Sequence, residues 1–206
     1  MPLDHVLIAM ADLRAAAAAL WSEHGLRAIE GGRHPDWGTA NWIVPLGSAY
    51  LELVGIADPD LAATTSFGQR ALQAIDAGGG PYAWCVRPGD LDATAARLGL
   101  AVAAGSRRRP DGRIVAWRMA GLDTAMQDAA RPFFIDWAVP PSLHPGRSPA
   151  RHRTPGPELA WIEVAGDVDT VRSWLGEPDL PVRIRPGEPA VLAVGISSGA
   201  QEFVLR

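Results

Sequence analysis

The sequence predicts an α+β protein built from tandem β-α-β-β-β modules, and the main observation behind this prediction is an internal repeat. An aspartate that follows a short apolar run recurs along the chain at nearly equal intervals, and a leucine recurs with it at the same intervals. A glycine follows soon after each leucine. The three sets are Asp12, Leu20 and Gly25; Asp90, Leu98 and Gly99; and Asp167, Leu175 and Gly176. Recurrence at a fixed period indicates duplicated structural units. We therefore expect curved mixed sheets around a cavity, with one helix per unit on the convex side.

Each element of the first unit can be justified locally. Leu3–Ala9 is short, apolar and rich in β-forming residues, which is typical of a buried strand. Asp12 can cap the following helix because its carboxylate can accept from the free N–H groups of the first turn. Apolar residues then recur at helical spacing, and Gly25 ends the helix. Three further strands are expected at about Arg27–Gly31, Thr39–Leu46 and Ala49–Gly55.

The second unit has the same pattern and the third is a shorter version of it. We expect modules at residues 3–56 and 82–138 within a domain spanning 1–140, and a compact C-terminal module at 158–206. Six prolines between 140 and 157 indicate a linker at 141–157. The stretch Asp58–Gly80 is expected to form a helical connection. The strands expected in the second module are Tyr82–Val86, Ala101–Ala104, Arg113–Ala120 and Phe133–Ala138.

Composition excludes several classes of protein. The net charge of −4 argues against a nucleic-acid-binding protein. The run Arg107–Arg109 beside Pro110-Asp111-Gly112 is expected to be a solvated hairpin tip. The single cysteine, Cys85, rules out an intramolecular disulfide and a zinc site built from cysteines. No secretory signal or membrane-spanning stretch is visible, so a cytoplasmic protein is expected.

Several short strings of residues carry a resemblance to a known family. Together they look like the glyoxalase-like members of the vicinal oxygen chelate superfamily, which includes glyoxalases, bleomycin resistance proteins and dioxygenases. The resemblance implies paired modules whose curved sheets enclose a cavity that often holds a divalent metal ion. The strings are Leu3-Asp4-His5-Val6, Gly31-Gly32-Arg33-His34-Pro35, Gly38-Thr39-Ala40-Asn41, Tyr50-Leu51-Glu52-Leu53 and the stretch from Pro132 to Trp137.

The same resemblance implies a metal site. In this superfamily the ligands come from the first and last strands of each module, which implies His5 and Glu52 in the first module. Aligning Asp12 with Asp90 places His5 opposite Ala83, which cannot ligate an ion, whereas aligning residues 50–53 with 134–137 places Asp136 opposite Glu52. The implied ligands are therefore His5, Glu52 and Asp136, for Zn, Ni, Mn or Mg, with one ligand position lost. The two-histidine, one-carboxylate set of iron dioxygenases is not expected at these positions.

Each candidate has a structural alternative. A histidine in a buried strand can be a hydrogen-bonded core residue, and for His5 the two readings are about equal. Glu52 lies between Leu51 and Leu53, so strand alternation places it on the opposite face from both. If those leucines pack on the helices, Glu52 faces the cavity, where it would be the catalytic residue. For Asp136, the sequence is equally consistent with an arginine or backbone partner and with a metal ion.

Residues around the turn at 35–38 and on neighbouring strands are candidates for substrate binding. The turn either forms a structural loop or lies at the cavity mouth, where Arg33 would suit a carboxylate. Tryptophans on the same strands could line the cavity. The candidates are Arg33, His34, Asn41, Trp42, Trp84 and Trp137.

The function expected from these residues is that of a metal-assisted lyase or isomerase acting on a small oxygenated metabolite, with Glu52 as ligand or proton shuttle. Ala83 and the supply of tryptophans favour an alternative, a metal-free protein that binds or sequesters a small molecule. In both cases the partner is a small molecule, with no nucleic acid and no membrane. The additional C-terminal unit could serve in a homodimer. Fold alone does not decide between the two functions.

Overall fold

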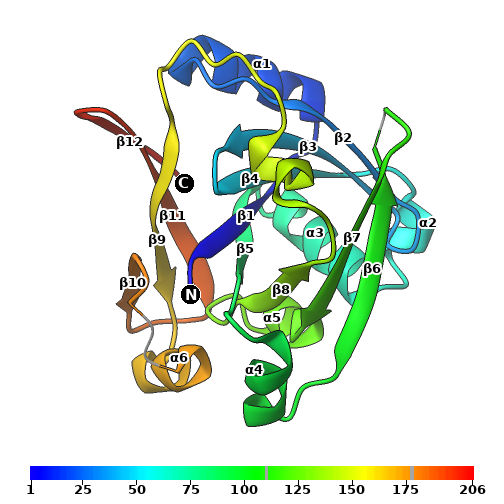
Figure 1. Ribbon diagram of the computed structural model, residues 1–206, viewed down its shortest axis with the longest axis vertical. Coiled ribbons are helices and arrows are strands. Elements are labelled where there is room, and N and C mark those ends of the chain that lie inside the picture. The colour runs from blue at the N-terminus through cyan, green and yellow to red at the C-terminus, as the bar shows by residue number, and fades with distance from the viewer. Residues whose placement is uncertain (110, 177–178) are drawn as a thin grey trace.

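The computed structural model describes residues 1–109, 111–176 and 179–206, which form a large sheet and a small one (Figure 1). The first module comprises β1 (Leu3–Ala9), α1 (Leu13–His24), β2 (Ile29–His34), β3 (Thr39–Leu46) and β4 (Ala49–Ile56). The second comprises β5 (Gly80–Val86), α4 (Leu91–Leu98), β6 (Val102–Arg108), β7 (Ile114–Ala120), α5 (Leu122–Gln127) and β8 (Phe133–Trp137). The third comprises β9 (Glu158–Ala165), α6 (Val168–Leu175), β10 (Val182–Arg185), β11 (Ala190–Ser198) and β12 (Gln201–Leu205). The predicted α+β class is confirmed.

The repeated aspartates cap the three helices, as their position before each helix predicts. Each side chain accepts from backbone N–H groups of the first turn, and a glycine with a left-handed backbone follows each last turn. The capping residues are Asp12, Asp90 and Asp167, and the glycines are Gly25, Gly99 and Gly176, with φ of 67°, 65° and 75°. The regular spacing of the repeat therefore reflects one structural requirement used three times.

The first two modules share one curved, nearly closed sheet of eight strands in the order β2-β3-β4-β1-β5-β8-β7-β6. Within each module the first strand pairs in parallel with the last, β1 with β4 and β5 with β8. The two modules join where β1 pairs antiparallel with β5. The edge strands β2 and β6 approach each other at the seam, where Arg107 donates to the carbonyl of Gly31. The sheet therefore encloses a space between the two modules.

Strand alternation divides the interior into two layers. Leu51, Leu53 and Trp84 pack on the convex side with residues of α1, α4 and α6. Leu7 and Cys85 face the concave side, where they pack with Phe67 of α3 and other side chains. The helices α2 (Pro59–Ala62) and α3 (Ser66–Asp76) form the connection between the modules. The expected helical segment within 58–80 is thus present, whereas α5 was not expected.

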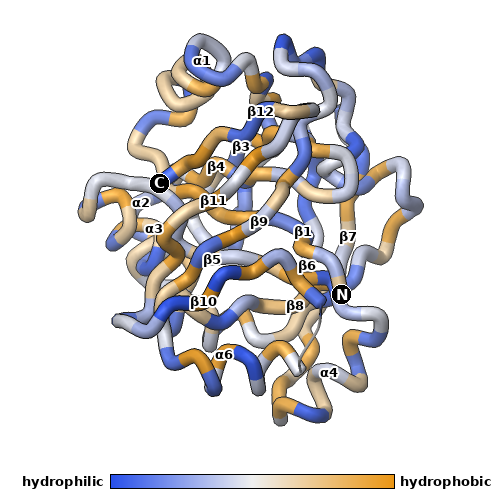
Figure 2. Tube along the Cα trace, turned by 90° about the vertical axis from the view of Figure 1, so that its left-hand side faces the viewer, coloured by the Kyte–Doolittle hydropathy of each residue, from blue (hydrophilic) through white to orange (hydrophobic). Residues whose placement is uncertain are grey.

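The third module has the expected order of elements but a different pairing of strands. Its sheet runs β10-β9-β11-β12, so the first strand lies inside the sheet, parallel to β10 and antiparallel to β11. Ile162, Val194 and Ile196 of this sheet join the convex core of the first two modules. Figure 2 shows the largely hydrophobic strand β11 crossing the middle of the molecule beside β9. The third module therefore covers the convex face of the large sheet.

The proline-rich segment is folded against the first module. It contains two short 3-10 helices, η1 (Pro141–Leu143) and η2 (Pro145–Arg147). The backbone N–H of Gly47 donates to the carbonyl of Gly146, and a Cβ at Gly146 would clash with the carbonyl oxygen of Ala49. Only glycine allows this close approach to β4. In the described part of the chain, no helix is both long and apolar enough to cross a membrane.

Candidate active site

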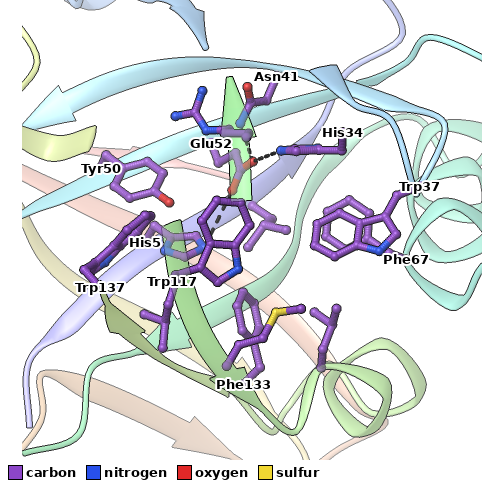
Figure 3. Close-up of a pocket in the computed structure, with 15 residues that line it drawn as sticks. His5, His34, Trp37, Asn41, Tyr50, Glu52, Phe67, Trp117, Phe133 and Trp137 are labelled. Carbon is purple, nitrogen blue, oxygen red and sulfur yellow. Dashed lines mark hydrogen bonds and ion pairs between the residues drawn. The ribbon is translucent and has the colours of Figure 1, made fainter. Parts of the chain in front are cut away.

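A cavity opens on the concave face of the large sheet and contains about 420 Å³ of space not filled by atoms (Figure 3). Its polar side chains come mainly from the first module, and its aromatic and aliphatic side chains mainly from the second module and α3. The polar lining residues are His5, His34, Asn41, Tyr50, Glu52 and Arg107. The apolar ones include Trp37, Phe67, Trp117, Met119, Phe133 and Trp137. The cavity therefore combines an apolar wall with a few convergent polar groups, the composition that small-molecule sites have.

Glu52 lies in the polar part of this cavity, on the face that strand alternation predicts. Its neighbours Leu51 and Leu53 pack on the convex side, while Glu52 is only 6% exposed. The amide Nδ2 of Asn41, on the adjacent strand β3, donates to its Oε1 at 2.5 Å. A buried carboxylate of this kind is costly unless it is paired or used. Glu52 is therefore a buried carboxylate that Asn41 holds in the polar part of the cavity.

Two imidazoles face this carboxylate. Nε2 of His5 lies 3.6 Å from Oε2 of Glu52, and Nε2 of His34 lies 3.5 Å from Oε1. Both separations exceed an ordinary hydrogen bond. Nδ1 of His5 bonds to Asp4 at 2.7 Å and Nδ1 of His34 bonds to the hydroxyl of Thr39 at 2.9 Å, so the outer nitrogen of each ring is held. Burial lowers the pKa of His34, which keeps this ring neutral near pH 7. The second imidazole comes from β2 and not from the first or last strand of a module, so the sequence prediction, which considered only those strands, did not include His34 in the metal site.

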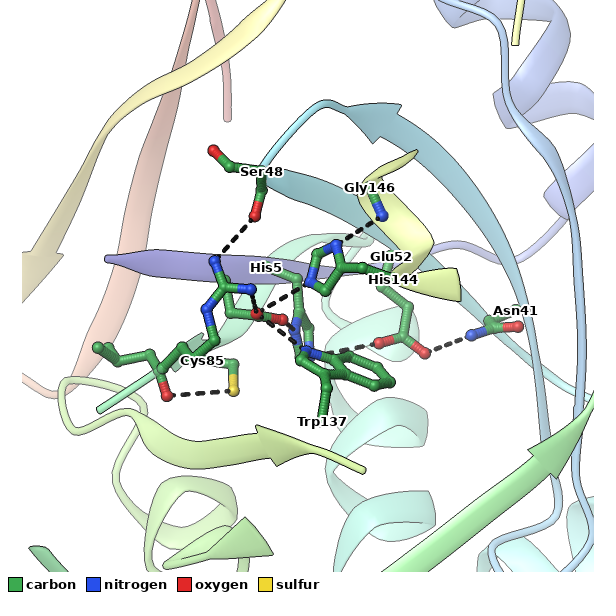
Figure 4. A network of polar contacts seen from close by, with 11 residues as sticks. His5, Asn41, Ser48, Glu52, Cys85, Trp137, His144 and Gly146 are labelled. Atoms are coloured by element: carbon green, nitrogen blue, oxygen red, sulfur yellow. Dashed lines mark hydrogen bonds and ion pairs between the residues drawn. The ribbon is translucent and has the colours of Figure 1, made fainter. Parts of the chain in front are cut away.

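Asp4 orients His5 through a hydrogen bond to Nδ1 of the ring. Figure 4 shows His5 in this polar network together with Trp137 and His144. Asp4 is fully buried and also accepts from Nε1 of Trp137 at 3.0 Å and from Nε2 of His144 at 3.1 Å. Nδ1 of His144 accepts from the N–H of Gly146, so its proton lies on Nε2. Burial raises the pKa of Asp4, but hydrogen bonds from His144 and His5 outweigh it and hold this pKa well below its usual value. Asp4 is therefore an ionised acceptor, and Nδ1 of His5 carries the proton.

Asp4 should make stability depend on pH in the acid range. Because its folded-state pKa is lowered, the stabilisation is present above its unfolded pKa of about 3.9 and is lost as pH falls below that value. Asp4→Asn is expected to reduce the free energy of unfolding at pH 7 by about 1.5–3 kcal/mol. It should also flatten the fall in stability below pH 4. Urea denaturation between pH 3 and pH 7 measures both effects, and equal acid slopes in the two proteins would contradict the assignment.

Arg107 corrects the expectation of a solvated hairpin tip. Strand β6 continues to Arg108, so alternate arginines face opposite sides of the sheet, and Arg107 is only 6% exposed whereas Arg108 is exposed. Pro110 lies outside the described residues. Asp111 and Arg109 form an ion pair near the turn, in keeping with the expected surface hairpin there. The missed signal was the continuation of the strand opposite Val115 and Trp117, which requires one arginine to point inward.

Four of the candidate residues lie away from the cavity. Trp84 is buried in the convex core and Trp42 packs against that core, because both alternate with residues that face inward. Arg33 is exposed because His34, its neighbour on β2, takes the inward position. Asp136 is exposed because Ile135 and Trp137 face the cavity. The structure brings the other candidates together in the cavity: His5, His34, Asn41, Glu52 and Trp137.

The register of the strands identifies the true counterparts of the first module's polar pair. Glu52 pairs with Leu7 of β1. The residue of the second module that corresponds to Leu7 is Cys85, whose parallel partner on β8 is Phe133. Phe133, not Asp136, therefore occupies the position equivalent to Glu52, and the alignment based on sequence was wrong in register. With Ala83 at the other position, the second module supplies apolar groups at both ligand positions.

Ligand atoms spaced closely enough to share a metal ion belong to a different group, and not to His5, His34 and Glu52 as these side chains stand. Among the described residues, ligand atoms of Asp4, His5 and Cys85 all lie within 4.8 Å of one another. The oxygens of Asp4 are already bonded to three N–H groups. Burial raises the pKa of the Cys85 thiol well above its usual value, which disfavours the thiolate that a metal requires. The donor set of His5, His34 and Glu52 is chemically better suited to an ion.

The paired β-α-β-β-β modules around a shared cavity define a protein of the vicinal oxygen chelate type. The model of the glyoxalase-like domain family matches residues 3–178, and the chain belongs to that family. Along its whole length the fold is similar to that of a hypothetical protein from Staphylococcus aureus, with 16% identity, 98% of each chain covered and a TM-score of 0.70.

Methylmalonyl-CoA epimerases were also matched, at lower similarity. The Mycobacterium tuberculosis epimerase is 21% identical over 66% of this chain and 85% of its own, with a TM-score of 0.44. A Streptomyces coelicolor epimerase in complex with 2-nitronate-propionyl-CoA is 19% identical over 66% of this chain and 97% of its own, with a TM-score of 0.47. No curated protein matches the sequence.

Proposed function

We propose that this protein is a metal-assisted enzyme of the isomerase or lyase type that moves a proton on a small oxygenated compound. The observation that carries the proposal is the buried carboxylate of Glu52, which reaches the cavity and is faced by Nε2 of His5 and of His34. Proton transfer next to a carbonyl needs a held base in a pocket that excludes water. The apolar lining from the second module supports such a pocket.

The chemistry of the donor set supports a divalent ion held by His5, His34 and Glu52. Metal-binding histidines usually donate the N–H of their other ring nitrogen to a carboxylate, a carbonyl or water, as Nδ1 of His5 does to Asp4. The two imidazole nitrogens favour Zn or Ni, whereas Mn and Mg prefer oxygen ligands. In this proposal His34 replaces Asp136 as the third ligand. When bound, such an ion would polarise the carbonyl oxygen of the substrate.

The remaining chemistry belongs to the side chains of this chain. Asn41 holds Oε1 of Glu52, which leaves Oε2 as the oxygen that accepts the proton from the carbon next to the carbonyl and returns it. Return of the proton to the same carbon gives exchange, whereas its delivery to the neighbouring carbon gives isomerisation. Trp117, Phe133 and Trp137 keep bulk water from the reacting carbon. The side chain of Tyr50 stacks on His5, with ring centroids 4.5 Å apart, and limits its rotation.

The test is metal binding by protein that was purified without a metal-binding tag and treated with a chelator. Zn²⁺, Mn²⁺ or Ni²⁺ at about 100 times its Kd should raise the Tm by roughly 5–10 °C, because a ligand bound to the native state stabilises it. His5→Ala and His34→Ala should each abolish this shift. Asp136→Asn is the matched control, since this exposed carboxylate should leave the shift unchanged.

Other outcomes are also informative. A shift that survives both histidine substitutions would place the ion elsewhere in the protein and contradict the proposed site. No shift in the parent protein would favour the second candidate function, a metal-free small-molecule binding protein. The specific observation that favours this alternative is that Ala83 and Phe133 occupy both ligand positions of the second module.

A further inference from the structure

Arg107 is a buried cation that the proposed proton transfer does not use. It extends from β6 of the second module across the seam, where Nη1 donates to the carbonyl of Gly31. Asn41, which holds Glu52, also lies against Gly31, since a Cβ at that glycine would overlap Oδ1 of Asn41. Arg107 therefore lines the cavity beside its polar part and next to the group that would carry out the chemistry.

The guanidinium has little compensation from the protein. Among the residues that the structure describes, no carboxylate oxygen lies within 4.0 Å of it, whereas the neighbouring Arg109 pairs with Asp111. A guanidinium carries five N–H donors, of which the bond to Gly31 accounts for one. Burial lowers the pKa of Arg107, although the more distant Glu52 and Tyr50 oppose this effect. A buried cation of this kind is costly unless an anion meets it.

The lining of the cavity indicates what that anion is attached to. The polar part holds Arg107 with Asn41 and Glu52, and the rest of the wall is formed by aromatic and aliphatic side chains. A planar guanidinium matches a carboxylate through two parallel hydrogen bonds, which adds geometric selectivity to charge. A ligand that satisfies both parts of the cavity has a carboxylate at one end and an apolar body at the other.

We infer that Arg107 anchors the carboxylate of the substrate, and that the substrates are small carboxylic acids with an apolar or aromatic body. The description of the ligand as a substrate rests on the proposed function, but the binding subsite does not. The seam between the two modules would then serve recognition, because one side chain both closes the sheet and selects the ligand.

The experiment compares two probes of the same shape, phenylacetate and phenylacetamide, by isothermal titration calorimetry with the full-length protein. The parent should bind phenylacetate at least about tenfold more tightly than the neutral amide, because charge-assisted hydrogen bonds are the stronger ones. Arg107→Met should remove this preference, because it weakens binding of phenylacetate more than binding of the amide. Arg108→Met, on the same strand but exposed, is the matched control and should keep the preference.

A second variant keeps the test decisive if Arg107→Met opens the seam and fails to fold. Arg107→Lys retains the positive charge but lacks the planar fork, so its preference for phenylacetate should be several times smaller than that of the parent. Equal binding of acid and amide by the parent, or an undiminished preference in a folded Arg107 variant, would overturn the inference. Phenyl phosphate that binds more tightly than phenylacetate would also overturn it in favour of a phosphate site.

Failure of the proposed function can be distinguished from failure of the anchor. Glu52→Gln should still prefer phenylacetate, because Arg107 is intact. If this preference is present but no proton exchange is found in the parent, the role of Arg107 in carboxylate binding is supported and the proposed enzymatic function is wrong. If exchange on neutral ketones is found without a preference for the acid, the anchor alone is wrong.

Discussion

Glu52→Gln is expected to lower the rate of proton exchange in the cavity by a factor of about 10² to 10⁴, the contribution typical of a positioned acid or base. Glutamine has nearly the same shape as glutamate but cannot take a proton at Oε2. The measurement follows loss of the carbon-bound proton signal by NMR in D₂O, for a panel of 2-oxo acids and α-hydroxy ketones. The panel includes acids and neutral compounds so that the result does not depend on Arg107.

Two further variants make the Glu52 result specific. Glu52→Asp keeps the carboxylate but shortens the side chain, so its rate should lie between those of the parent and Glu52→Gln. Asp136→Asn removes an exposed carboxylate from β8 and should exchange as fast as the parent. Exchange at the parent rate in Glu52→Gln would exclude this carboxylate as the base.

Trp84→Ala is expected to reduce the free energy of unfolding by about 3–5 kcal/mol, because it opens a large void in the convex core. The side chain is fully buried, and its Nε1 has no hydrogen-bond partner among the described residues. Trp84→Phe should therefore have a much smaller effect, since it keeps an aromatic ring and removes an unsatisfied donor. Urea denaturation at pH 7 measures both.

Trp42 and Trp137 provide the comparison for Trp84. Trp42→Ala should be less destabilising, because this side chain is only partly buried at the edge of the same core. Binding of phenylacetate should be unchanged in Trp84→Phe and weakened in Trp137→Ala, since Trp137 lines the cavity. Weakened binding in Trp84→Phe together with unchanged stability in Trp84→Ala would restore the discarded expectation that Trp84 contacts the ligand.

Much of the fold follows from local signals in the sequence. Asp12, Asp90 and Asp167 predict where helices begin because capping depends on residues within one turn. The alternation of Leu51, Glu52 and Leu53 predicts which side chain enters the cavity, because successive residues of a strand face opposite sides. Both kinds of signal involve only a few neighbouring residues, so they can be recognised without knowledge of the tertiary structure.

The parts of the site that were missed depend on pairing between distant segments. Asp136 was placed in the cavity through an alignment that did not allow for the helix α5 and the register of β8, which bring Phe133 to that position. Arg107 was assigned to solvent because the closeness of β2 and β6 is a property of the closed sheet. Asp4 stood beside His5 in an apolar strand, but its other partners, Trp137 and His144, are 133 and 140 positions away.

The hydrogen bond from His144 to Asp4 also bears on the order in which the protein can mature during its synthesis. The last strand of the shared sheet, β8, ends at Trp137, whereas His144 and the glycine that fixes its tautomer, Gly146, lie beyond it. A nascent chain that has left the ribosome only as far as β8 has all eight strands of the large sheet. In that chain Asp4 lacks one of its three hydrogen-bond donors, His144, and therefore does not yet hold His5 in its final orientation. The strands that line the pocket are therefore synthesised before the residues that complete its hydrogen bonds.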